Sequence, residues 1–521
     1  MHAKRAATFL LRLARGAAVL VLIAALAIFA ARLFFPLPDI SSRAAGTAIP
    51  ADPATTLGAR MAGAGGRSGV VALREGRDAL ASRLALAATA QRSIDAQYYI
   101  WHDDTSGIML LDALRKAAGR GVRVRLLLDD NGVPGLDGFM AALNARENFE
   151  VRLFNPSTVR RPKLLGYTFD FPRMNRRMHN KSFTVDGAVT IVGGRNIGDE
   201  YFQVVGDAFY VDLDVLATGA IVPQTAAVFD EYWNSASVFE VERIVPGPGD
   251  PDGLQARIAQ VAASQEARDL VEGFRNSADR YLTHVAGIEW TDVQVVADDP
   301  VKGQGIARAD QLMVSRLGQI LGEVKERLDL VSAYFVPGEA ATAYVTELAR
   351  AGRQVHILTN ALNTTDVLVV HAGYTKYRRR LLEAGIGLNE LKLRASAGSE
   401  AELQLNPFGL SGASLHAKTF AVDRRRIFIG SFNFDPRSAI LNCEMGFLID
   451  SPKLAQDVSA AFDGPIAAVS YRPELTPEGK MVWLETVGDG KTVVYQEEPG
   501  STWFQQAAIA VIGLLPIEWL L

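Results

Sequence analysis

One pattern occurs twice in this chain and constrains its fold more than any other feature. Residues 179–186 and residues 416–423 both fit H-x-K-x-x-x-x-D. Tyr98 precedes the first histidine by 81 residues, and Tyr334 precedes the second by 82. Because two separate features repeat at nearly the same offset, the spacing predicts a duplicated domain.

Around both motifs the hydrophobic pattern alternates between helices and strands. The expected elements are helices 79–92 and 107–118 and strands 94–100, 122–128, 328–335 and 355–359. Such alternation is typical of a parallel sheet with helices on both faces. We therefore predict an α/β fold with two mixed, mainly parallel sheets flanked by helices.

The 521 residues are too many for one compact core and divide into six expected segments. These are an N-terminal membrane anchor or signal segment (1–36), a linker (37–72), a first half (73–245), a linker with a helical segment (246–285), a second half (286–495) and an apolar C-terminal membrane-associating segment (496–521). Residues 290–296 are expected to form the first strand of the second half.

Both ends of the chain carry apolar runs that indicate work at a bilayer. Sixteen uncharged residues lie between Arg15 and Arg32, and the run reaches a spanning length of about 20 residues if Arg32 snorkels and the count continues to Phe35. The sequence favours an uncleaved anchor, and a cleaved signal or a peripheral helix stays open. Residues 507–517 are too short to span and predict a buried or interfacial helix.

Composition excludes several classes of protein. A single cysteine, Cys443, allows no internal disulfide and no cysteine-ligated metal site. The net charge of −4 is unlike that of general nucleic-acid binders, which have a basic excess. The motifs of zincins, serine hydrolases and P-loop proteins are missing, so neither a metal nor another cofactor is expected.

The repeated motif suits chemistry at phosphorus. On a strand of period two, each histidine and lysine project side by side, and the turns Gly193–Asn196 and Gly430–Asn433 can return an amide to them. Two imidazoles, two ammonium groups and two amides make a donor-rich pocket for a phosphate diester. One imidazole can attack phosphorus, giving a phosphohistidine, while the other protonates the leaving alkoxide.

The motif and its turns resemble those of the phospholipase D superfamily. Four further segments, 97–104, 194–202, 432–438 and 515–521, resemble bacterial cardiolipin synthases of the C type. The similarity runs from about residue 70 to the C-terminus. It implies two α/β halves that are related by a pseudo-twofold axis and share one site at their interface.

The resemblance also implies a membrane-associated phosphatidyltransferase of phospholipid biosynthesis. A phosphatidyl group would pass through a histidine to phosphatidylglycerol, giving cardiolipin, with phosphatidylethanolamine as the expected donor. The expected partners are these phospholipids and the bilayer, without nucleic acid, and the expected place is the bacterial inner (cytoplasmic) membrane. A hydrolytic phospholipase D that releases phosphatidic acid, a superfamily nuclease or phosphodiesterase, and a non-catalytic scaffold are the alternatives. The side of the membrane and the oligomeric state stay open.

Residue roles follow from the same resemblance. His179 would be the nucleophile and His416 the acid/base, although the pseudo-symmetry leaves that choice open. The implied phosphate ligands are Lys181, Lys418, Asn196, Asn433 and Ser431.

Three kinds of supporting residue complete the expected site. Asp186 and Asp423 end the two motifs and are more often buttresses than reactants. An acidic partner for each histidine is expected on the following strand. The residues chosen are Asp212 and Glu444, with Asp214 as a rival to Asp212. Gly194 stands where the second copy has Ser431, so the first half lacks one hydroxyl.

Overall fold

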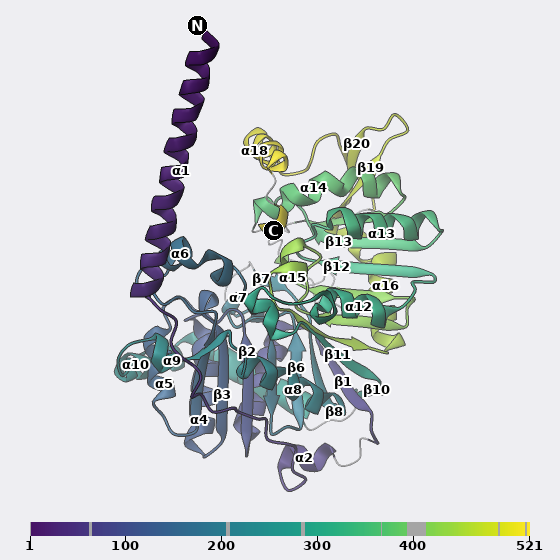
Figure 1. Ribbon diagram of the computed structural model, residues 1–521. Coiled ribbons are helices and arrows are strands. Elements are labelled where there is room, and N and C mark those ends of the chain that lie inside the picture. Colours follow the sequence, from purple (N-terminus) through teal and green to yellow (C-terminus); the bar gives the residue numbers. More distant parts are fainter. Residues whose placement is uncertain are drawn as a thin grey trace.

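The chain folds into two large β-sheets with helices packed around them, one sheet in each half (Figure 1). This computed structural model describes residues 2–61, 65–204, 209–282, 287–365, 367–392, 413–487, 490–515 and 518–520. The sheets meet along a seam, and helix α1 extends away from both (Figure 1).

The first sheet has nine strands in a single layer. Their spatial order is β10 (Glu289–Thr291), β1 (Ser68–Leu73), β8 (Asp214–Gly219), β6 (Val189–Gly193), β5 (Ser182–Val185), β2 (Ser93–Tyr98), β3 (Arg123–Asp129), β4 (Phe149–Phe154) and β9 (Val238–Glu240). The helices of this part are α2 (Thr56–Met61), α3 (Gly76–Thr89), α4 (Thr105–Gly119), η1 (Asp130–Gly132), α5 (Asp137–Asn144), α6 (Leu164–Met174), α7 (Asp199–Phe202), α8 (Ile221–Trp233), α9 (Val241–Ile244), α10 (Pro251–Ala262) and α11 (Gln265–Leu282).

The second sheet has ten strands. Their order is β11 (Val293–Ala297), β18 (Met445–Ile449), β17 (Arg426–Gly430), β16 (Lys418–Val422), β12 (Arg327–Ser332), β13 (Gln354–Asn360), β14 (Gly387–Leu391), β19 (Ser470–Leu475), β20 (Met481–Thr486) and β21 (Thr492–Tyr495). Its helices are η2 (Pro300–Gln304), η3 (Ala309–Gln311), α12 (Met313–Leu321), α13 (Gly338–Arg350), α14 (Leu368–Glu383), α15 (Pro436–Ile440), α16 (Pro452–Asp463), α17 (Ile466–Val469), α18 (Trp503–Leu514) and η4 (Glu518–Leu520).

The duplication is visible in the strand order. Seven strands of the first sheet, β1-β8-β6-β5-β2-β3-β4, match β11-β18-β17-β16-β12-β13-β14 of the second. Both sheets are mixed, as predicted, but the expectation of mainly parallel sheets is wrong. In the described chain, the parallel pairs within the two large sheets are β2–β3, β3–β4, β12–β13 and β13–β14. Short turns join β5 to β6 and β16 to β17, and such turns force antiparallel pairing.

Two expected boundaries also change. Residues 37–72 were expected to be a linker, yet they contain α2 and β1, and β1 lies inside the first sheet because it pairs with β8 on one side and β10 on the other. The expected strand 290–296 is divided, since β10 extends the first sheet and β11 the second. This segment therefore crosses from one half to the other and supplies an edge strand to each sheet.

The seam between the halves has its own hydrophobic core. Buried side chains of the first sheet, such as Val192 and Val215, pack in one cluster with Ile429 and Phe447 of the second. A small sheet also joins the halves, because β7 (Phe209–Val211) pairs in parallel with β15 (Ala413–Leu415). The two halves thus share a continuous interface.

Two apolar helices lie outside these cores. Within the described chain, α1 (His2–Phe34) contains one stretch long and apolar enough to cross a membrane, Arg15–Phe34, with mean hydropathy 2.6 and no buried residue. Helix α18 is shorter and has no buried residue either. Trp503 and Leu514, near its two ends, are 71% and 86% exposed.

Candidate active site

The two motif histidines lie on the seam, each held by backbone of the opposite half. The N–H of His179 donates to the carbonyl of Cys443 (2.8 Å), and the N–H of His416 donates to the carbonyl of Val211 (2.8 Å). Both histidines are more than nine-tenths buried. The shared interface therefore fixes the backbone of both motifs.

Each imidazole faces a carboxylate from the other half. Nδ1 of His179 lies 2.8 Å from Oε2 of Glu444, and Nδ1 of His416 lies 2.5 Å from Oδ2 of Asp212. Asp212 and Glu444 are both fully buried. The rival Asp214 points elsewhere, because its Oδ2 accepts a hydrogen bond from Arg83 (2.9 Å).

The partners of His179 determine its tautomer. Its Nδ1 also lies 3.1 Å from the carbonyl oxygen of Ser431, which can only accept a hydrogen bond. Nδ1 therefore carries the proton, and Nε2 keeps a free lone pair. A neutral imidazole with an unprotonated Nε2 has the form that a nucleophile needs.

Burial dominates the electrostatics of the site. It lowers the pKa of His179 and of His416 well below the usual range, and both lysines of the motifs lower it further. Burial raises the pKa of Glu444 to about 7 and lowers that of Lys181 to about 7. Both imidazoles are therefore neutral at pH 7 in the free protein.

The lysines stay close to their own histidines. Nζ of Lys181 donates to the carbonyl of His179 (2.6 Å), and Nζ of Lys418 donates to the carbonyl of His416. Lys181 also faces the ring of Tyr99, with Nζ 5.6 Å from the ring centroid. The ammonium groups thus lie beside the imidazoles, where they can neutralise a bound phosphate.

The expected amide and hydroxyl ligands differ in their availability. Asn196 is engaged, since Oδ1 accepts from the N–H of Ile100 (3.2 Å) and Nδ2 donates to the Tyr201 hydroxyl (3.0 Å). In contrast, the buried Oδ1 of Asn433 has no hydrogen-bond partner among the described residues. The Ser431 hydroxyl donates to Oε2 of Glu444 (2.5 Å), so it supports the carboxylate that faces His179.

Gly194 differs from Ser431 for a steric reason. A Cβ at Gly194 would lie 2.1 Å from Oδ1 of Asp212. The shorter aspartate of the first half occupies the space that the serine side chain takes in the second. The absence of a side chain at Gly194 therefore leaves room for the Asp212 carboxylate beside His416.

The motif aspartates do not join the histidines. Asp186 accepts hydrogen bonds from the backbone N–H groups of residues 91–93, which lead into β2. Asp423 makes the same contacts with the N–H groups of residues 325–327 before β12. Each aspartate is the seventh residue after its histidine, on the order of 20 Å away along an extended chain. Both carboxylates buttress the fold, and the structure does not bring Asp186 and Asp423, which the motif groups with the catalytic residues, to the histidines.

Aromatic rings beside the imidazoles were not singled out in the sequence. The Tyr99 ring contacts His179 edge-on at 5.1 Å, and the rings of Tyr201 and Tyr210 lie 5.1 and 5.2 Å from His416. The alternation of side-chain direction along β2 could have predicted the position of Tyr99. Tyr98 is buried in the core, so the next residue, Tyr99, must face the other side of the sheet.

A second duplicated feature was also missed. Oδ2 of Asp129, the last residue of β3, accepts from the N–H of Met178 (2.8 Å), just before His179. Oδ1 of Asn360, the last residue of β13, accepts from the N–H of Leu415 (2.9 Å), just before His416. These side chains hold the two histidine segments against their sheets.

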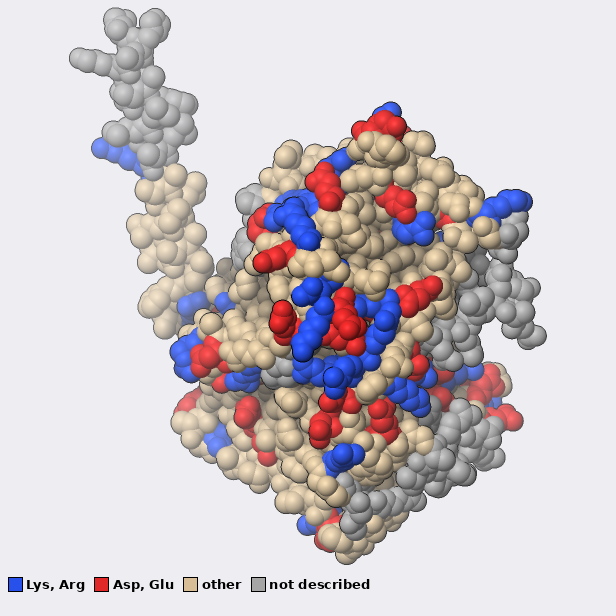
Figure 2. Space-filling model, turned by 90° about the vertical axis from the view of Figure 1, so that its right-hand side faces the viewer, with Lys and Arg blue, Asp and Glu red and all other residues tan. Residues whose placement is uncertain are grey.

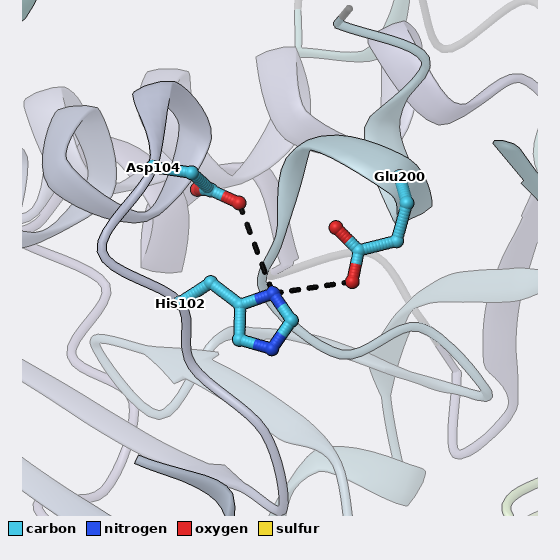
Figure 3. A group of neighbouring side chains, drawn as sticks. All are labelled: His102, Asp104 and Glu200. Atoms are coloured by element: carbon cyan, nitrogen blue, oxygen red, sulfur yellow. Dashed lines mark ion pairs between the residues drawn. The ribbon is translucent and has the colours of Figure 1, made fainter. Parts of the chain in front are cut away.

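Figure 3 shows His102, Asp104 and Glu200, the one group of His, Cys, Asp or Glu side chains in the described chain that is close enough to share a cation. Nδ1 of His102 lies 3.1 Å from Glu200 and 3.9 Å from Asp104. Oδ2 of Asp104 already accepts from the N–H of Asp199 (2.7 Å). The group is an ion pair that joins α4 to α7, the helix that carries Tyr201, and its hydrogen bond to Glu200 raises the pKa of His102.

Comparison with known proteins agrees with this geometry. The family model described as "Cardiolipin synthase, PLD-like domain" matches residues 84–233 and 317–465, one match in each half. The chain belongs to this family. It is 42% identical to cardiolipin synthase C of Escherichia coli (strain K12) over 462 residues, which cover 88% of this chain and 97% of the relative.

More distant similarities extend the comparison. A cardiolipin synthase of Staphylococcus aureus (strain Mu50) is 27% identical over 395 residues, covering 75% of this chain and 66% of the relative. The crystal structure of phosphatidylserine synthase from Haemophilus influenzae has a TM-score of 0.53 at 14% identity, and covers 87% of this chain and 95% of that one. This likeness supports the two-sheet fold. The protein is thus a phospholipase D-like enzyme of the cardiolipin synthase family.

Proposed function

We propose that this enzyme makes cardiolipin by moving a phosphatidyl group from phosphatidylethanolamine to phosphatidylglycerol. The observation that carries the proposal is the reciprocal pairing of His179 with Glu444 and His416 with Asp212 across the seam. Two buried, neutral imidazoles with oriented Nδ1 atoms supply both a nucleophile and an acid/base. The 42% identity to cardiolipin synthase C over nearly the whole chain supports the choice of lipids.

The proposed reaction has two displacements at phosphorus. The negative charge of the bound phosphate diester favours a protonated His416, which is neutral in the free protein, so that a proton then sits on its Nε2. Nε2 of His179 attacks the donor phosphate, and the bond from phosphorus to the ethanolamine oxygen breaks as His416 delivers this proton to that oxygen and becomes neutral. His416 then takes the proton of a phosphatidylglycerol hydroxyl, which attacks phosphorus and releases His179. Lys181, Lys418 and the side-chain amide of Asn433, through its Nδ2 donor, are the groups proposed to face the phosphate.

His179 suits the role of nucleophile better than His416. A backbone carbonyl holds the proton of His179 on Nδ1, and that carbonyl cannot titrate during the reaction. Both histidines face a carboxylate through Nδ1, but Asp212 lies closer to His416 (2.5 Å) than Glu444 lies to His179 (2.8 Å), so a proton on Nε2 gives an imidazolium that is more closely paired at His416. The asymmetry supports His179 as the residue that becomes phosphorylated and His416 as the one that exchanges protons.

The proposed location is the bacterial inner membrane. Helix α1 would act as the anchor, because Arg15–Phe34 has spanning length and no buried residue. Helix α18 would lie at the interface with its exposed apolar side chains among the lipids. The chain enters α18 from an anchored point, since Glu498 accepts hydrogen bonds from His371 (2.7 Å) and Arg378 (2.7 Å).

Surface charge gives no support to a nuclease. Figure 2 shows one face on which Lys and Arg side chains alternate with Asp and Glu, and the whole chain carries a net charge of −4. A protein that tracks a nucleic-acid backbone instead presents a basic groove.

Purified protein in vesicles of phosphatidylethanolamine and phosphatidylglycerol tests the proposal, with lipid products identified by mass spectrometry. We expect cardiolipin to form only when both lipids are present, and to be lost in His179→Ala and in His416→Ala. The matched control is His356→Ala, because His356 also pairs with a carboxylate, Asp329, but lies on β13 outside both motifs. Phosphatidic acid as the only product would mean that water is the acceptor. Product formation by either active-site variant would overturn the two-histidine mechanism.

A further inference from the structure

We propose that helix α6 is a second membrane-contact element, which seats the first half of the active site on a phospholipid bilayer. The inference rests on the proposed function, because lipid substrates must reach the seam from a bilayer. It adds an interaction surface to the anchor α1 and the terminal helix α18. The occupant of this surface is the headgroup region of the membrane that α1 crosses, on the side where α1 ends.

The position of α6 follows from its contacts with the end of α1. Nε of Arg32 donates to the carbonyl of Phe169 (3.2 Å), and the Phe35 ring stacks on the Phe169 ring with centroids 6.0 Å apart. The Thr158 hydroxyl, just before α6, donates to the carbonyl of Phe35 (3.0 Å). Figure 1 shows α6 directly beside the lower end of α1.

The length of α1 then places α6 at a known depth. The 20 residues Arg15–Phe34 rise about 1.5 Å each, or about 30 Å, which equals the hydrocarbon thickness of a typical bilayer. When this stretch spans the membrane, its last turn reaches the far surface of the hydrocarbon. Because Arg32 and Phe35 both contact α6, that helix lies within one helical turn of the same surface.

The side chains of α6 fit this position. Leu164 is 74% exposed, Leu165 is 51% exposed and Phe171 is 41% exposed, although Phe169 of the same helix is buried against the chain. Single exposed apolar residues are normal on a soluble surface. Three of them on one short helix that is kinked at Asp170, beside the end of a spanning segment, are typical of an element that inserts shallowly into a bilayer.

Helix α6 is also connected to the reactive centre. The Tyr167 hydroxyl donates to Oδ1 of Asn131 in η1 (3.2 Å). The N–H of Asn131 donates to Asp129, which in turn accepts from Met178, the neighbour of His179. A bilayer that holds α6 in place thus supports the segment that positions the proposed nucleophile.

The second half faces the end of α6 through Arg437. Its guanidinium donates to the side chain and the carbonyl of Asn175, directly after α6, and to the carbonyl of Leu520 in η4, close to α18. Arg437 also lowers the pKa of His179 through its charge. Arg437 therefore links the end of α6 to η4, the segment that follows α18, and also acts on the site, as expected for the rim of a lipid entrance.

Spin labels on single cysteines in the full-length protein test the inference. Leu164→Cys and Phe171→Cys report on α6. The matched control is Val314→Cys on α12, because the Val314 side chain is 40% exposed. The native Cys443 is buried, and burial raises its thiol pKa to about 12, so it does not compete for the label. In vesicles of phosphatidylethanolamine and phosphatidylglycerol, we expect both α6 labels to gain contact with apolar oxygen and lose contact with a water-soluble nickel complex by at least threefold relative to Val314→Cys.

Cardiolipin formation is measured on the same samples, which separates the two proposals. Labels at 164 and 171 that stay as water-accessible as the label at 314, in active protein, would overturn the membrane contact of α6 and leave the proposed function intact. Lipid-exposed labels in protein that forms no cardiolipin would support the contact and count against the proposed function.

Discussion

Nδ1 of His416 lies 2.5 Å from Oδ2 of Asp212, although the two residues belong to different halves of the molecule. In the same way, Oε2 of Glu444 in the second half lies 2.8 Å from Nδ1 of His179 in the first half. Neither half alone therefore holds an imidazole together with its orienting carboxylate. The two halves of the duplicated fold therefore form one shared site, and neither half is expected to be active alone.

Replacement of either carboxylate by its amide tests this dependence. We expect Asp212→Asn and Glu444→Gln each to lower kcat by about 10- to 100-fold, because the imidazole loses the partner that fixes its orientation and stabilises its charged form. Steady-state cardiolipin formation in vesicles measures the change. The control, Asp214→Asn, removes a buried salt bridge with Arg83, so it should lower Tm and leave kcat near that of the wild type below the transition. A normal kcat in both amide variants would contradict the role given to the carboxylates.

Gly194 offers a steric test of the same contact. A methyl group there would lie 2.1 Å from Oδ1 of Asp212 and must displace the carboxylate that faces His416. We expect Gly194→Ala to lower kcat by about 10-fold or more, with the loss comparable to that of Asp212→Asn. Gly318→Ala is the matched control, because Gly318 lies inside α12 with no atom within 4 Å of its added Cβ, and there the substitution should be neutral or stabilising. Full activity of Gly194→Ala would show that the close approach is relaxed in solution.

The sequence was sufficient for much of this site, for a definite reason. Repetition at a fixed offset revealed both motifs and therefore the two halves, and a hydrophobic pattern of strands and helices revealed the central parallel strands β2–β3 and β12–β13. Asp212 and Glu444 were chosen because an acidic partner for each histidine was expected on the following strand, and the structure pairs each of them with the histidine of the other half. Which half supplies which carboxylate could not be predicted, since a repeat describes each copy and not how the copies pack.

Other features of the site and the fold could not be predicted from the sequence, because they depend on tertiary geometry. Asn196 has the residue type of a phosphate ligand, yet its amide is used by Ile100 and Tyr201. The antiparallel strands were underestimated, because the alternation of helices and strands is clear only near residues 79–128 and 328–359. The turn at Asp186, with φ of +52°, joins two strands too closely for a helix to lie between them.

Asp186 and Asp423 should control stability rather than chemistry. Each accepts hydrogen bonds from three consecutive backbone N–H groups, and an unsatisfied buried donor costs roughly 1–3 kcal/mol. We expect Asp186→Ala to lower Tm more than Asp423→Ala, since Asp186 is fully buried. Calorimetry measures Tm, and cardiolipin formation well below Tm should stay within about twofold of the wild type. Glu474→Ala, which breaks an exposed ion pair with Arg472, is the control and should leave Tm nearly unchanged.

Acid should weaken the contribution of Asp423 to the stability of the folded protein. Its backbone hydrogen bonds outweigh burial and lower the pKa of Asp423 below its usual 3.8. A group with a depressed folded pKa stabilises the protein fully above its unfolded pKa and loses that contribution as the pH falls through the folded value. The difference in Tm between the wild type and Asp423→Ala should therefore be constant above about pH 5 and shrink below pH 3.8. A difference that grows on acidification would contradict this assignment.

The pH profile of catalysis should have its alkaline limit in Lys181. Burial lowers the pKa of Lys181 to about 7, so the free enzyme loses this ammonium group as the pH rises above neutrality. Because kcat/KM reports the free enzyme, we expect it to fall above about pH 7 as the positive charge that faces the phosphate disappears. Lys181→Arg keeps a cation at all accessible pH values, so it should remove this limb even if its maximal kcat/KM is lower. Initial rates between pH 5 and 9 in vesicles of constant composition provide the measurement. An alkaline limb that persists unchanged in Lys181→Arg would assign the titration to another group, of which Glu444, with its pKa raised to about 7, is the first to test by Glu444→Gln.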